Sequence, residues 1–390
     1  MISRRQFVAT AASAGAVLGA NDRIRIAVIG AGGRGSALMK ELSVCANVEV
    51  NAICDVYNAN RERAAAVARK TWGTQPFETT QYMAVLDRKD VDAVFIATPD
   101  FSHPIILKAA VEAGKDAYCE KPVAADFAPA RAAYQAVKAS PQVVQIGTQR
   151  RSDGQFIAAS KLIQAGVIGK VTRVDISMNF QEPRWRRDFS GIQERDVDWT
   201  QFRMHRQPKA FSAREFREWQ LFRDYTNGIA GLWMCHFIDT IAWFMDDPYP
   251  AGAVASGGVY LWRDGRETSD VFHALLDYPK GFLVSFAMSL TNSAGTRNLW
   301  FGTKGTLDAD KWVLSGEGSR EPDRVQSATK IEPLSATSHM QNFIDCIRSR
   351  ETPRAGIEAG FSHAVACCMA SQALETGRKI RFDRERLEFV

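Results

Sequence analysis

Features that the sequence lacks already exclude several classes of protein and of binding site. Beyond its first twenty residues, the 390-residue chain has no apolar run approaching the ~20 residues of a membrane-spanning helix. It has no basic tract interleaved with aromatic residues, and its formal net charge is only +5, so nucleic acid is not an expected partner. The 7 cysteines are odd in number and form no C-x-x-C pair. We therefore expect a soluble mature chain with free thiols and no metal site.

A glycine-rich loop at residues 30–35 is the most informative segment. An apolar run rich in β-branched residues breaks there into Gly-Ala-Gly-Gly-Arg-Gly. Gly30, Gly32 and Gly35 fit G-x-G-x-x-G, in which the first glycine permits the turn, the second lets the backbone approach a pyrophosphate, and the third lets a helix pack on the strand. The helix that begins here presents free N–H groups to the phosphates. We expect the whole loop to bind a dinucleotide, including Ala31, Gly33 and Arg34.

An acidic residue stands where such a cofactor places its ribose. A second apolar run, 48–54, ends at Asp55, which follows Gly35 by 20 residues. A carboxylate at this position accepts hydrogen bonds from the ribose hydroxyls and repels a 2′-phosphate, so it favours NAD. Arg61 and Arg63 on the next helix leave NADP as the less favoured cofactor. The alternative is an ordinary βαβ unit with a polar residue at the end of a strand.

The first 20 residues resemble an export signal. Arg4 and Arg5 precede a short run of Ala, Gly, Val and Leu that ends at Ala20, the expected cleavage site. Paired arginines before a short, weakly hydrophobic run are typical of the twin-arginine route, which carries folded proteins. We expect a periplasmic or otherwise exported protein, and a cytoplasmic one if the segment is no signal. Free thiols are unusual in the periplasm and count slightly against export.

The pattern of strands and helices predicts two α/β domains without internal repeats. Up to about residue 148, short apolar strands alternate with Ala-rich helical segments, which predicts a doubly wound parallel sheet. After a helix at about 155–166, longer alternating runs predict an open, largely antiparallel sheet. We place the strands at 26–30, 48–54, 92–97, 116–119 and 143–147, and then at 170–180, 252–262, 270–278, 282–290 and 297–307.

These patterns divide the chain into three parts. Residues 1–20 are the signal segment, 21–150 an NAD-binding Rossmann domain, and 151–390 an α+β domain for substrate binding. Residues 181–227 are rich in Trp, Arg and Phe but have little periodicity. Long irregular segments are usually functional loops or lids, so we expect this one to form a wall of the substrate pocket. Further helices are expected at about 229–245, 336–350 and 355–377.

Polar residues follow three strands of the first domain, where ligands of doubly wound folds bind. Lys121 follows a buried strand, and beside a nicotinamide it could donate to a substrate hydroxyl and stabilise a developing alkoxide. Glu120 could orient it or contact the cofactor. The alternative is a surface Glu-Lys pair, which the buried strand and Pro122 disfavour. The other strand ends carry Thr98, Pro99, Asp100 and His103, and then Gln149, Arg150 and Arg151.

A histidine in the second domain has two possible roles. His236 and Asp239 stand three residues apart in an apolar segment, hence on one face of a helix. A histidine in such a segment is most often a satisfied core residue. It could instead be a general base for a sugar hydroxyl, because its ordinary pKa lies near neutrality.

Taken together, these motifs resemble the glucose–fructose oxidoreductase, inositol dehydrogenase and rhizopine catabolism superfamily (Gfo/Idh/MocA), from about residue 22 to the C-terminus. The resemblance implies a nicotinamide cofactor, usually a sugar, polyol or glycoside substrate, and a second domain that often forms an oligomer interface. It also implies that Lys121 is the catalytic lysine and His236 the catalytic histidine. The motifs that carry it are 30–35, Cys54-Asp55-Val56, Ala97-Thr98-Pro99-Asp100 with His103, Glu120-Lys121-Pro122, Gly147 to Arg151, and His236-x-x-Asp239.

One position departs from the family pattern. Members commonly carry an aspartate four residues before the histidine, where this chain has Leu232. Asp239, Tyr225 or an arginine of 184–187 could compensate. We expect an NAD-dependent oxidoreductase acting on a sugar or glycoside hydroxyl, with Arg151, Trp185 and Tyr225 lining its pocket. The alternatives are a redox-neutral enzyme that cleaves or epimerises a glycoside through a transient keto-sugar, and a non-catalytic binding protein.

Overall fold

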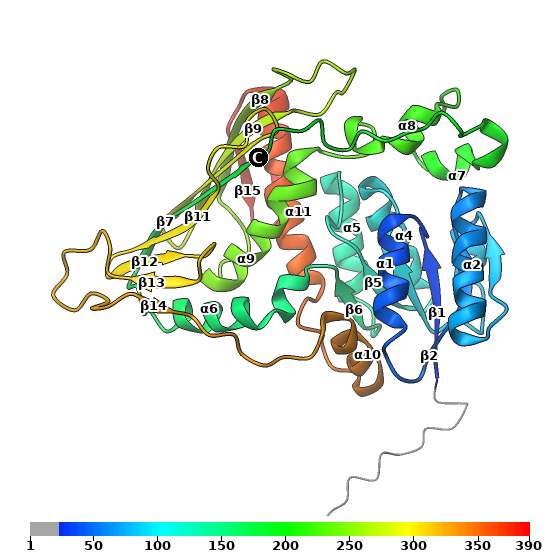
Figure 1. The fold of residues 1–390 in the computed structure, drawn as a ribbon, viewed down its shortest axis with the longest axis horizontal. Coiled ribbons are helices and arrows are strands. Elements are labelled where there is room, and N and C mark those ends of the chain that lie inside the picture. The colour runs from blue at the N-terminus through cyan, green and yellow to red at the C-terminus, as the bar shows by residue number, and fades with distance from the viewer. Residues whose placement is uncertain (1–22) are drawn as a thin grey trace, which may run out of the picture.

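The computed structural model describes residues 23–390. The predicted export signal at 1–20 therefore lies outside the described residues. Two sheets with their helices make up the described part (Figure 1). None of its helices is long and apolar enough to cross a membrane. All 7 cysteines are free thiols, and Cys45 alone is not buried.

The first sheet is a parallel sheet of 6 strands in the order β3-β2-β1-β4-β5-β6, which confirms the doubly wound prediction. Its central strands are buried on both faces, as expected for a sheet covered by helices on each side. The short strand β3 has no apolar alternation and was not predicted. The strands are β1 (Ile24–Ile29), β2 (Val48–Cys54), β3 (Phe77–Thr79), β4 (Ala93–Ile96), β5 (Asp116–Cys119) and β6 (Val144–Ile146).

The helices on this sheet come mostly from the same half of the chain. They are α1 (Gly33–Leu42), α2 (Asn58–Trp72), α3 (Tyr82–Leu86), α4 (His103–Glu112) and α5 (Phe127–Lys138). Helix α10 (His339–Ser349) also packs here, although it comes from near the end of the chain (Figure 1). Its Phe343 is fully buried and meets Phe95 and Tyr118 edge-on, at centroid distances of 5.5 and 5.9 Å.

The second sheet has 10 strands in the order β14-β13-β12-β11-β7-β10-β9-β8-β15-β16. Only β7 and β10 pair in parallel, so the prediction of a largely antiparallel sheet is confirmed. The strands are β7 (Val171–Asn179), β8 (Gly252–Gly258), β9 (Val271–Tyr278), β10 (Phe282–Ser289), β11 (Arg297–Gly302), β12 (Gly305–Asp308), β13 (Val313–Ser315), β14 (Thr329–Lys330), β15 (Ile380–Asp383) and β16 (Glu388–Phe389).

Two of the predicted strands are too long. The run 252–262 ends as a strand at Gly258, because the buried Asp270 carboxylate accepts the backbone N–H groups of residues 260, 261 and 262 at 2.9, 2.9 and 2.8 Å and turns the chain. The run 297–307 folds into a hairpin of β11 and β12, in which Gly302 pairs with Gly305.

Helices cover the face of the second sheet that is turned toward the first domain. They are α6 (Gly154–Gln164), α9 (Cys235–Met245) and α11 (Ile357–Thr376). Figure 1 shows α9 and α11 between the two sheets. Helix α11 contacts α5, α9 and β8, and it is buried over most of its length. It therefore joins the two domains through apolar packing.

Residues 181–227, here called the cover segment, contain the short helices α7 (Trp199–Arg203) and α8 (Ala213–Arg217). The segment runs over the carboxyl ends of the first sheet's strands (Figure 1). It is anchored there by backbone bonds, from Asp198 N–H to the Val56 carbonyl at 2.8 Å and from Phe101 N–H to the Tyr225 carbonyl at 3.3 Å. This anchoring encloses a space between the cover segment and the strand ends.

Candidate functional site

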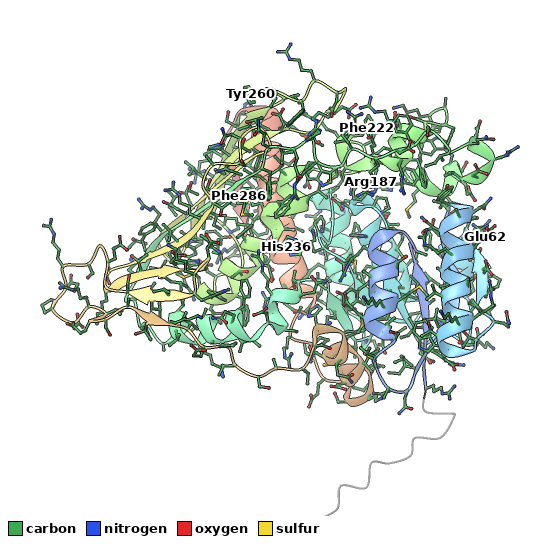
Figure 2. All side chains as sticks on the ribbon, viewed as in Figure 1. Glu62, Arg187, Phe222, His236, Tyr260 and Phe286 are labelled. Carbon is green, nitrogen blue, oxygen red and sulfur yellow. The ribbon has the colours of Figure 1, made fainter. Side chains whose placement is uncertain are left out.

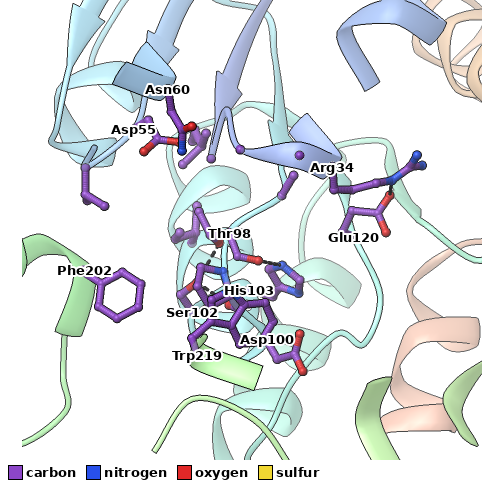
Figure 3. Close-up of a pocket in the computed structure, with 18 of the residues that line it drawn as sticks. Arg34, Asp55, Asn60, Thr98, Asp100, Ser102, His103, Glu120, Phe202 and Trp219 are labelled. Atoms are coloured by element: carbon purple, nitrogen blue, oxygen red, sulfur yellow. Dashed lines mark hydrogen bonds and ion pairs between the residues drawn. The ribbon is translucent and has the colours of Figure 1, made fainter. Parts of the chain in front are cut away.

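A cavity of about 530 Å³ lies at the carboxyl edge of the first sheet, under the cover segment. Its size is in the range of small-molecule and cofactor sites. Figure 3 shows residues of the glycine loop, the strand ends and the cover segment around it. Of the predicted cofactor residues, those lining the cavity are Gly30, Gly32, Gly33, Arg34, Asp55, Thr98, Pro99, Asp100, His103, Glu120, Lys121 and Gln149.

The glycine loop has the backbone geometry that its motif predicts. Gly30 has φ +88°, and a Cβ there would lie 2.7 Å from the carbonyl carbon of Ala97. A Cβ on Gly35 would lie 2.0 Å from the Gly30 carbonyl oxygen, so α1 packs directly on the loop. A Cβ on Gly33 would meet nothing within 4 Å, and α1 has no side-chain cap. The open backbone and uncapped N–H groups fit the diphosphate of a dinucleotide.

Asp55 supports this loop as well as lining the cavity. Its buried carboxylate accepts the Ala31 N–H at 2.7 Å and the Tyr57 N–H at 2.8 Å. Burial raises the pKa of Asp55, and these hydrogen bonds oppose the rise. Ala31 does not line the cavity, because its side chain is fully buried and its N–H faces Asp55. One acid thus fixes the loop's shape and remains placed for a ribose.

Arg61 and Arg63, the two arginines that kept NADP as a possible cofactor, donate hydrogen bonds to neighbouring oxygens. Arg61 donates to the Asp55 carbonyl at 2.9 Å and to Asn58 at 2.7 Å. Arg63 donates to the Ala31 carbonyl at 3.0 Å. With both guanidinium groups engaged and a carboxylate at Asp55, the site fits NAD.

A salt bridge that the sequence did not reveal joins the glycine loop to the end of β5. Arg34 Nε donates to Glu120 Oε1 at 2.6 Å, and the Glu120 side chain is only 6% exposed. The other carboxylate oxygen of Glu120 accepts the Lys121 N–H at 3.2 Å. The first turn of α1 and the backbone of Lys121 are thus held by one carboxylate (Figure 3).

Lys121 reaches across the cavity to the second domain. Its Nζ donates to the backbone carbonyl of Leu232 at 3.1 Å, and both residues line the cavity. A main-chain oxygen therefore contacts the lysine at Leu232, the position where the resemblance led us to expect an aspartate. This bond depends on the five-residue π-helix at Ala230–Met234 that precedes α9, which periodicity alone does not predict.

His103 and Asp100 line the cavity, but both are also buried and hydrogen-bonded within the protein. The ring nitrogens of His103 lie 2.7 Å from the carbonyls of Pro122 and Thr98, and burial lowers its pKa to about 4. Asp100 accepts the Thr226 hydroxyl at 2.7 Å, and burial raises its pKa to about 7 against the opposing effects of this bond and of Lys121. His103 thus ties the ends of β4 and β5 together, and Asp100 ties the end of β4 to the cover segment.

His236 lies near the start of α9, between the two domains (Figure 2). Burial lowers the pKa of its imidazole well below the usual value, and the positive charges of Lys121 and Arg150 lower it further. Its ring is therefore neutral at pH 7. The lowered pKa makes this ring a weaker base than a free imidazole, and His236 is not among the residues that line the cavity.

Arg151 and Asp239 pair with each other and do not line the cavity. Arg151 Nε donates to Asp239 Oδ1 at 2.8 Å, and the two side chains are 15% and 1% exposed. Burial raises the pKa of Asp239, and Arg151 opposes the rise. Arg151, predicted to line the substrate pocket, and Asp239, predicted to compensate for Leu232, instead neutralise each other outside the lining of this cavity.

The aromatic residues predicted to line the pocket do not do so. Tyr225 is fully buried; its hydroxyl accepts from Arg203 at 2.6 Å and donates to Glu215 at 3.0 Å. Trp185 is partly buried and packs against the large apolar core that both domains share. Because the cover segment has no hydrophobic periodicity, the sequence did not indicate which of its side chains point inward. The cover segment instead contributes to the cavity through Arg187, Gln201, Phe202, Met204, Phe216, Arg217, Trp219 and Gln220.

Two family models match the chain. Residues 24–148 match the model described as the oxidoreductase family with an NAD-binding Rossmann fold, and residues 156–308 match the GFO/IDH/MocA C-terminal domain. Among curated relatives, inositol 2-dehydrogenase of Rhizobium meliloti is 32% identical over 154 residues, which cover 40% of this chain and 44% of that protein. The scyllo-inositol 2-dehydrogenase (NAD(+)) of Bacillus subtilis is 34% identical over 38% of this chain and 42% of that protein. The matched region thus spans less than half the length of these relatives.

Solved structures share the fold over nearly the whole chain. The aldose-aldose oxidoreductase of Caulobacter crescentus, complexed with glycerol, has a TM-score of 0.71 at 17% identity and covers 92% of this chain and 100% of its own. The WlbA dehydrogenase of Bordetella pertussis, in complex with NADH and UDP-GlcNAcA, has a TM-score of 0.70 at 16% identity, over 93% of this chain and 99% of its own. At these identities the likeness concerns the fold alone.

Proposed function

The chain belongs to the GFO/IDH/MocA oxidoreductase family and carries its NAD-binding Rossmann domain, and from this premise we propose that it oxidises a hydroxyl of a sugar, polyol or glycoside by hydride transfer. NAD, when bound, supplies the acceptor carbon for that hydride. The residues that would hold it are the glycine loop and Asp55, with the strand ends at Thr98 and Glu120. Two curated relatives, matched over 40% and 38% of this chain, are inositol dehydrogenases.

One observation carries the proposal: Lys121, on the cavity wall, is bonded to the turn that leads directly into the helix of His236. The ammonium group of Lys121 can donate to a substrate hydroxyl and stabilise the alkoxide that develops as the hydride leaves. His236, four residues beyond Leu232 of the cavity wall, is the proposed acceptor of the hydroxyl proton, because its ring is uncharged before the reaction. The Leu232 carbonyl orients Lys121 in place of a carboxylate side chain, so the amine keeps a polar partner without a second charge.

A redox-neutral cycle is the second candidate function. The cover segment encloses the cavity from the side opposite the glycine loop, which would slow exchange of a bound dinucleotide. We propose that the cofactor is retained and restored in each turnover, through sugar–sugar oxidoreduction, epimerisation or cleavage of a glycoside by way of a keto-sugar. Oxidation to a ketone acidifies the adjacent C–H bond, which makes elimination of a leaving group feasible.

The experiment that tests both candidates starts with the nucleotide that copurifies with the protein, identified by mass spectrometry. A panel of inositols, aldoses and glycosides is then followed by NADH absorbance and by product analysis, without and with added NAD. Net NADH formation supports the dehydrogenase, and conversion without added NAD or net absorbance change supports the redox-neutral cycle. Binding of NADH without turnover of any substrate would favour a binding protein instead.

Two further proposals concern the protein in the cell. We propose export by the twin-arginine route, tested by fusing residues 1–22 to a reporter with and without Arg4→Lys and Arg5→Lys. We also propose a homo-oligomer formed through the second sheet, whose face away from the helices exposes Val254 (38%) and Leu275 (43%). Light scattering of the wild type and Leu275→Asp tests it: a monomeric wild type would contradict the proposal.

A further inference from the structure

Two arginines of the cover segment line the cavity opposite the glycine loop. Arg187 precedes the first short helices of the segment, and Arg217 ends α8. Figure 2 shows Arg187 on the side of the cover segment that faces the first domain. The two side chains therefore meet the same enclosed space from separate parts of the chain.

Neither guanidinium group has a carboxylate partner. Across residues 23–390, no ion pair within 4.0 Å and no side-chain hydrogen bond involves the guanidinium of Arg187 or Arg217. The nearby arginines of the cover segment are different, because Arg186, Arg203, Arg206 and Arg214 each bind a carboxylate. The exposed Asp188 is near enough for Arg217 to lower its pKa, but its carboxylate accepts the Ser190 N–H instead. Arg187 and Arg217 therefore differ from these four arginines in lining the cavity without a carboxylate partner among the described residues.

Glu218 explains how the pair is held in place. Its side chain is 0% exposed, and it accepts the Arg187 backbone N–H at 2.7 Å together with Arg186 Nε and Arg214 Nε at 3.0 Å each. This buried carboxylate fixes the backbone on both sides of the cavity arginines while its own oxygens are taken by other donors. The backbone that carries the pair is therefore fixed by a buried carboxylate, whereas the two guanidinium groups bond no protein group in the part of the chain that the structure describes: Arg187 is exposed and Arg217 partly exposed.

The electrostatics of the pair favour an anion. Burial lowers the pKa of Arg187, and the like charge of Arg217 lowers it further, more than Glu218 raises it. Two unpaired positive charges facing one cavity repel each other, and an anion between them would remove that repulsion. A planar guanidinium matches phosphate and carboxylate oxygens with two parallel hydrogen bonds.

We propose that Arg187 and Arg217 form a binding site for a phosphate or carboxylate group inside this cavity. The inference rests on the proposed function only in assuming that the cavity takes cofactor and substrate. The anion has two sources: the diphosphate of the dinucleotide, gripped from the side opposite the glycine loop, or an acidic group on the sugar. In the first case the pair locks the cofactor in place, and in the second it selects an anionic substrate.

The test uses the full chain, stripped of nucleotide, with Arg187→Gln, Arg217→Gln and the double variant. Arg195→Gln is the matched control, because Arg195 belongs to the same segment but its side chain is 80% exposed and outside the cavity. Calorimetry measures binding of inorganic phosphate and inorganic diphosphate, first to the stripped protein and then to protein saturated with NADH. NADH affinity is measured for every variant by fluorescence.

We expect the double variant to bind the inorganic anion at least about tenfold more weakly than the wild type, and the control to change less than about twofold. If NADH abolishes anion binding and the double variant also binds NADH about tenfold more weakly, the source is the cofactor. If anion binding persists with NADH and NADH affinity is unchanged, the source is the substrate. Equal anion and NADH affinities in wild type and double variant would overturn the proposal. Absence of NADH binding to the wild type would instead overturn the proposed function, since anion binding to the stripped protein still reports on the arginines.

Discussion

The salt bridge between Arg34 and Glu120 should stabilise the site far more than an ordinary surface pair. Arg34→Gln leaves the nearly buried Glu120 carboxylate with the Lys121 N–H at 3.2 Å and the Tyr118 hydroxyl at 3.4 Å. Removing one partner of a fully buried pair costs about 3–5 kcal/mol. Because the Arg34 side chain is 34% exposed, solvent screens part of this loss, and we expect the free energy of unfolding to fall by about 2 kcal/mol.

In a double-mutant cycle of this pair, Glu120→Gln should lower the free energy of unfolding less than Arg34→Gln does. After Glu120→Gln, Arg34 keeps its second partner, Glu41, at 2.9 Å, so we expect a loss of about 1 kcal/mol. In the double variant the Arg34–Glu120 interaction is lost once, whereas the sum of the two single changes counts this loss twice. The coupling energy from the four proteins should therefore be about 1–2 kcal/mol.

The free energies of unfolding of the four proteins are measured by urea unfolding followed by circular dichroism. The exposed pair of Lys108 and Glu112 is the matched control. Their N···O distance is 2.6 Å, but their side chains are 43% and 54% exposed, so coupling should stay near or below about 0.5 kcal/mol. If the coupling of Arg34 to Glu120 is no larger than that of the exposed pair, burial of the carboxylate does not strengthen the bridge, and our reasoning about the loop is wrong.

Three further predictions follow from single residues. Gly35→Ala places a Cβ 2.0 Å from the Gly30 carbonyl oxygen and should cost about 2–3 kcal/mol of stability and most NADH binding, whereas Gly33→Ala, with open space around it, should change unfolding little. Lys121→Met should keep NADH affinity within about threefold and lower kcat by about a hundredfold or more; unchanged kcat would remove Lys121 from the proposed chemistry. Burial lowers the pKa of His339 to about 4, so the unfolded chain binds more protons and stability should fall as the pH drops from about 6.5 to 4, by about 3 kcal/mol from this residue. His339→Gln can keep the bond to the Ile146 carbonyl and should show a shallower loss, and parallel stability curves would contradict this.

The first domain could be predicted well because its signals are local. The positive φ at Gly30 and the close packing of Gly35 on Gly30 involve residues within one strand, loop and helix, although the space around Gly30 is also limited by Ala97 at the end of β4. The strand ends that carry Asp55 and Lys121 are marked by apolar runs, and parallel strands bring their carboxyl ends to one edge. Strand pairing then gathers residues that lie far apart in sequence around a single cavity.

The cover segment could not be predicted in the same way. It has no period that separates inward from outward positions, so Trp185 and Tyr225 were expected in the pocket, where Arg187, Arg217 and Trp219 lie instead. Its conformation is decided by long-range contacts, such as the bonds that Glu218 accepts from Arg186 and from the backbone of Arg187. Partners of this kind are paired by tertiary packing and leave no pattern in a single sequence.

Local sequence signals sufficed to predict the two-domain architecture and the dinucleotide loop, because these follow from glycine sterics and from the two- and 3.6-residue periods of strand and helix, and the spacing after the loop sufficed to predict the acid that favours NAD. The packed structure was needed to show that a backbone carbonyl at Leu232 holds Lys121, that Arg151 and Asp239 neutralise each other, and that Arg187 and Arg217 line the cavity without a carboxylate partner within residues 23–390. Which charged side chains pair depends on the distance between them in space, and that distance is fixed only once the helices and sheets have packed.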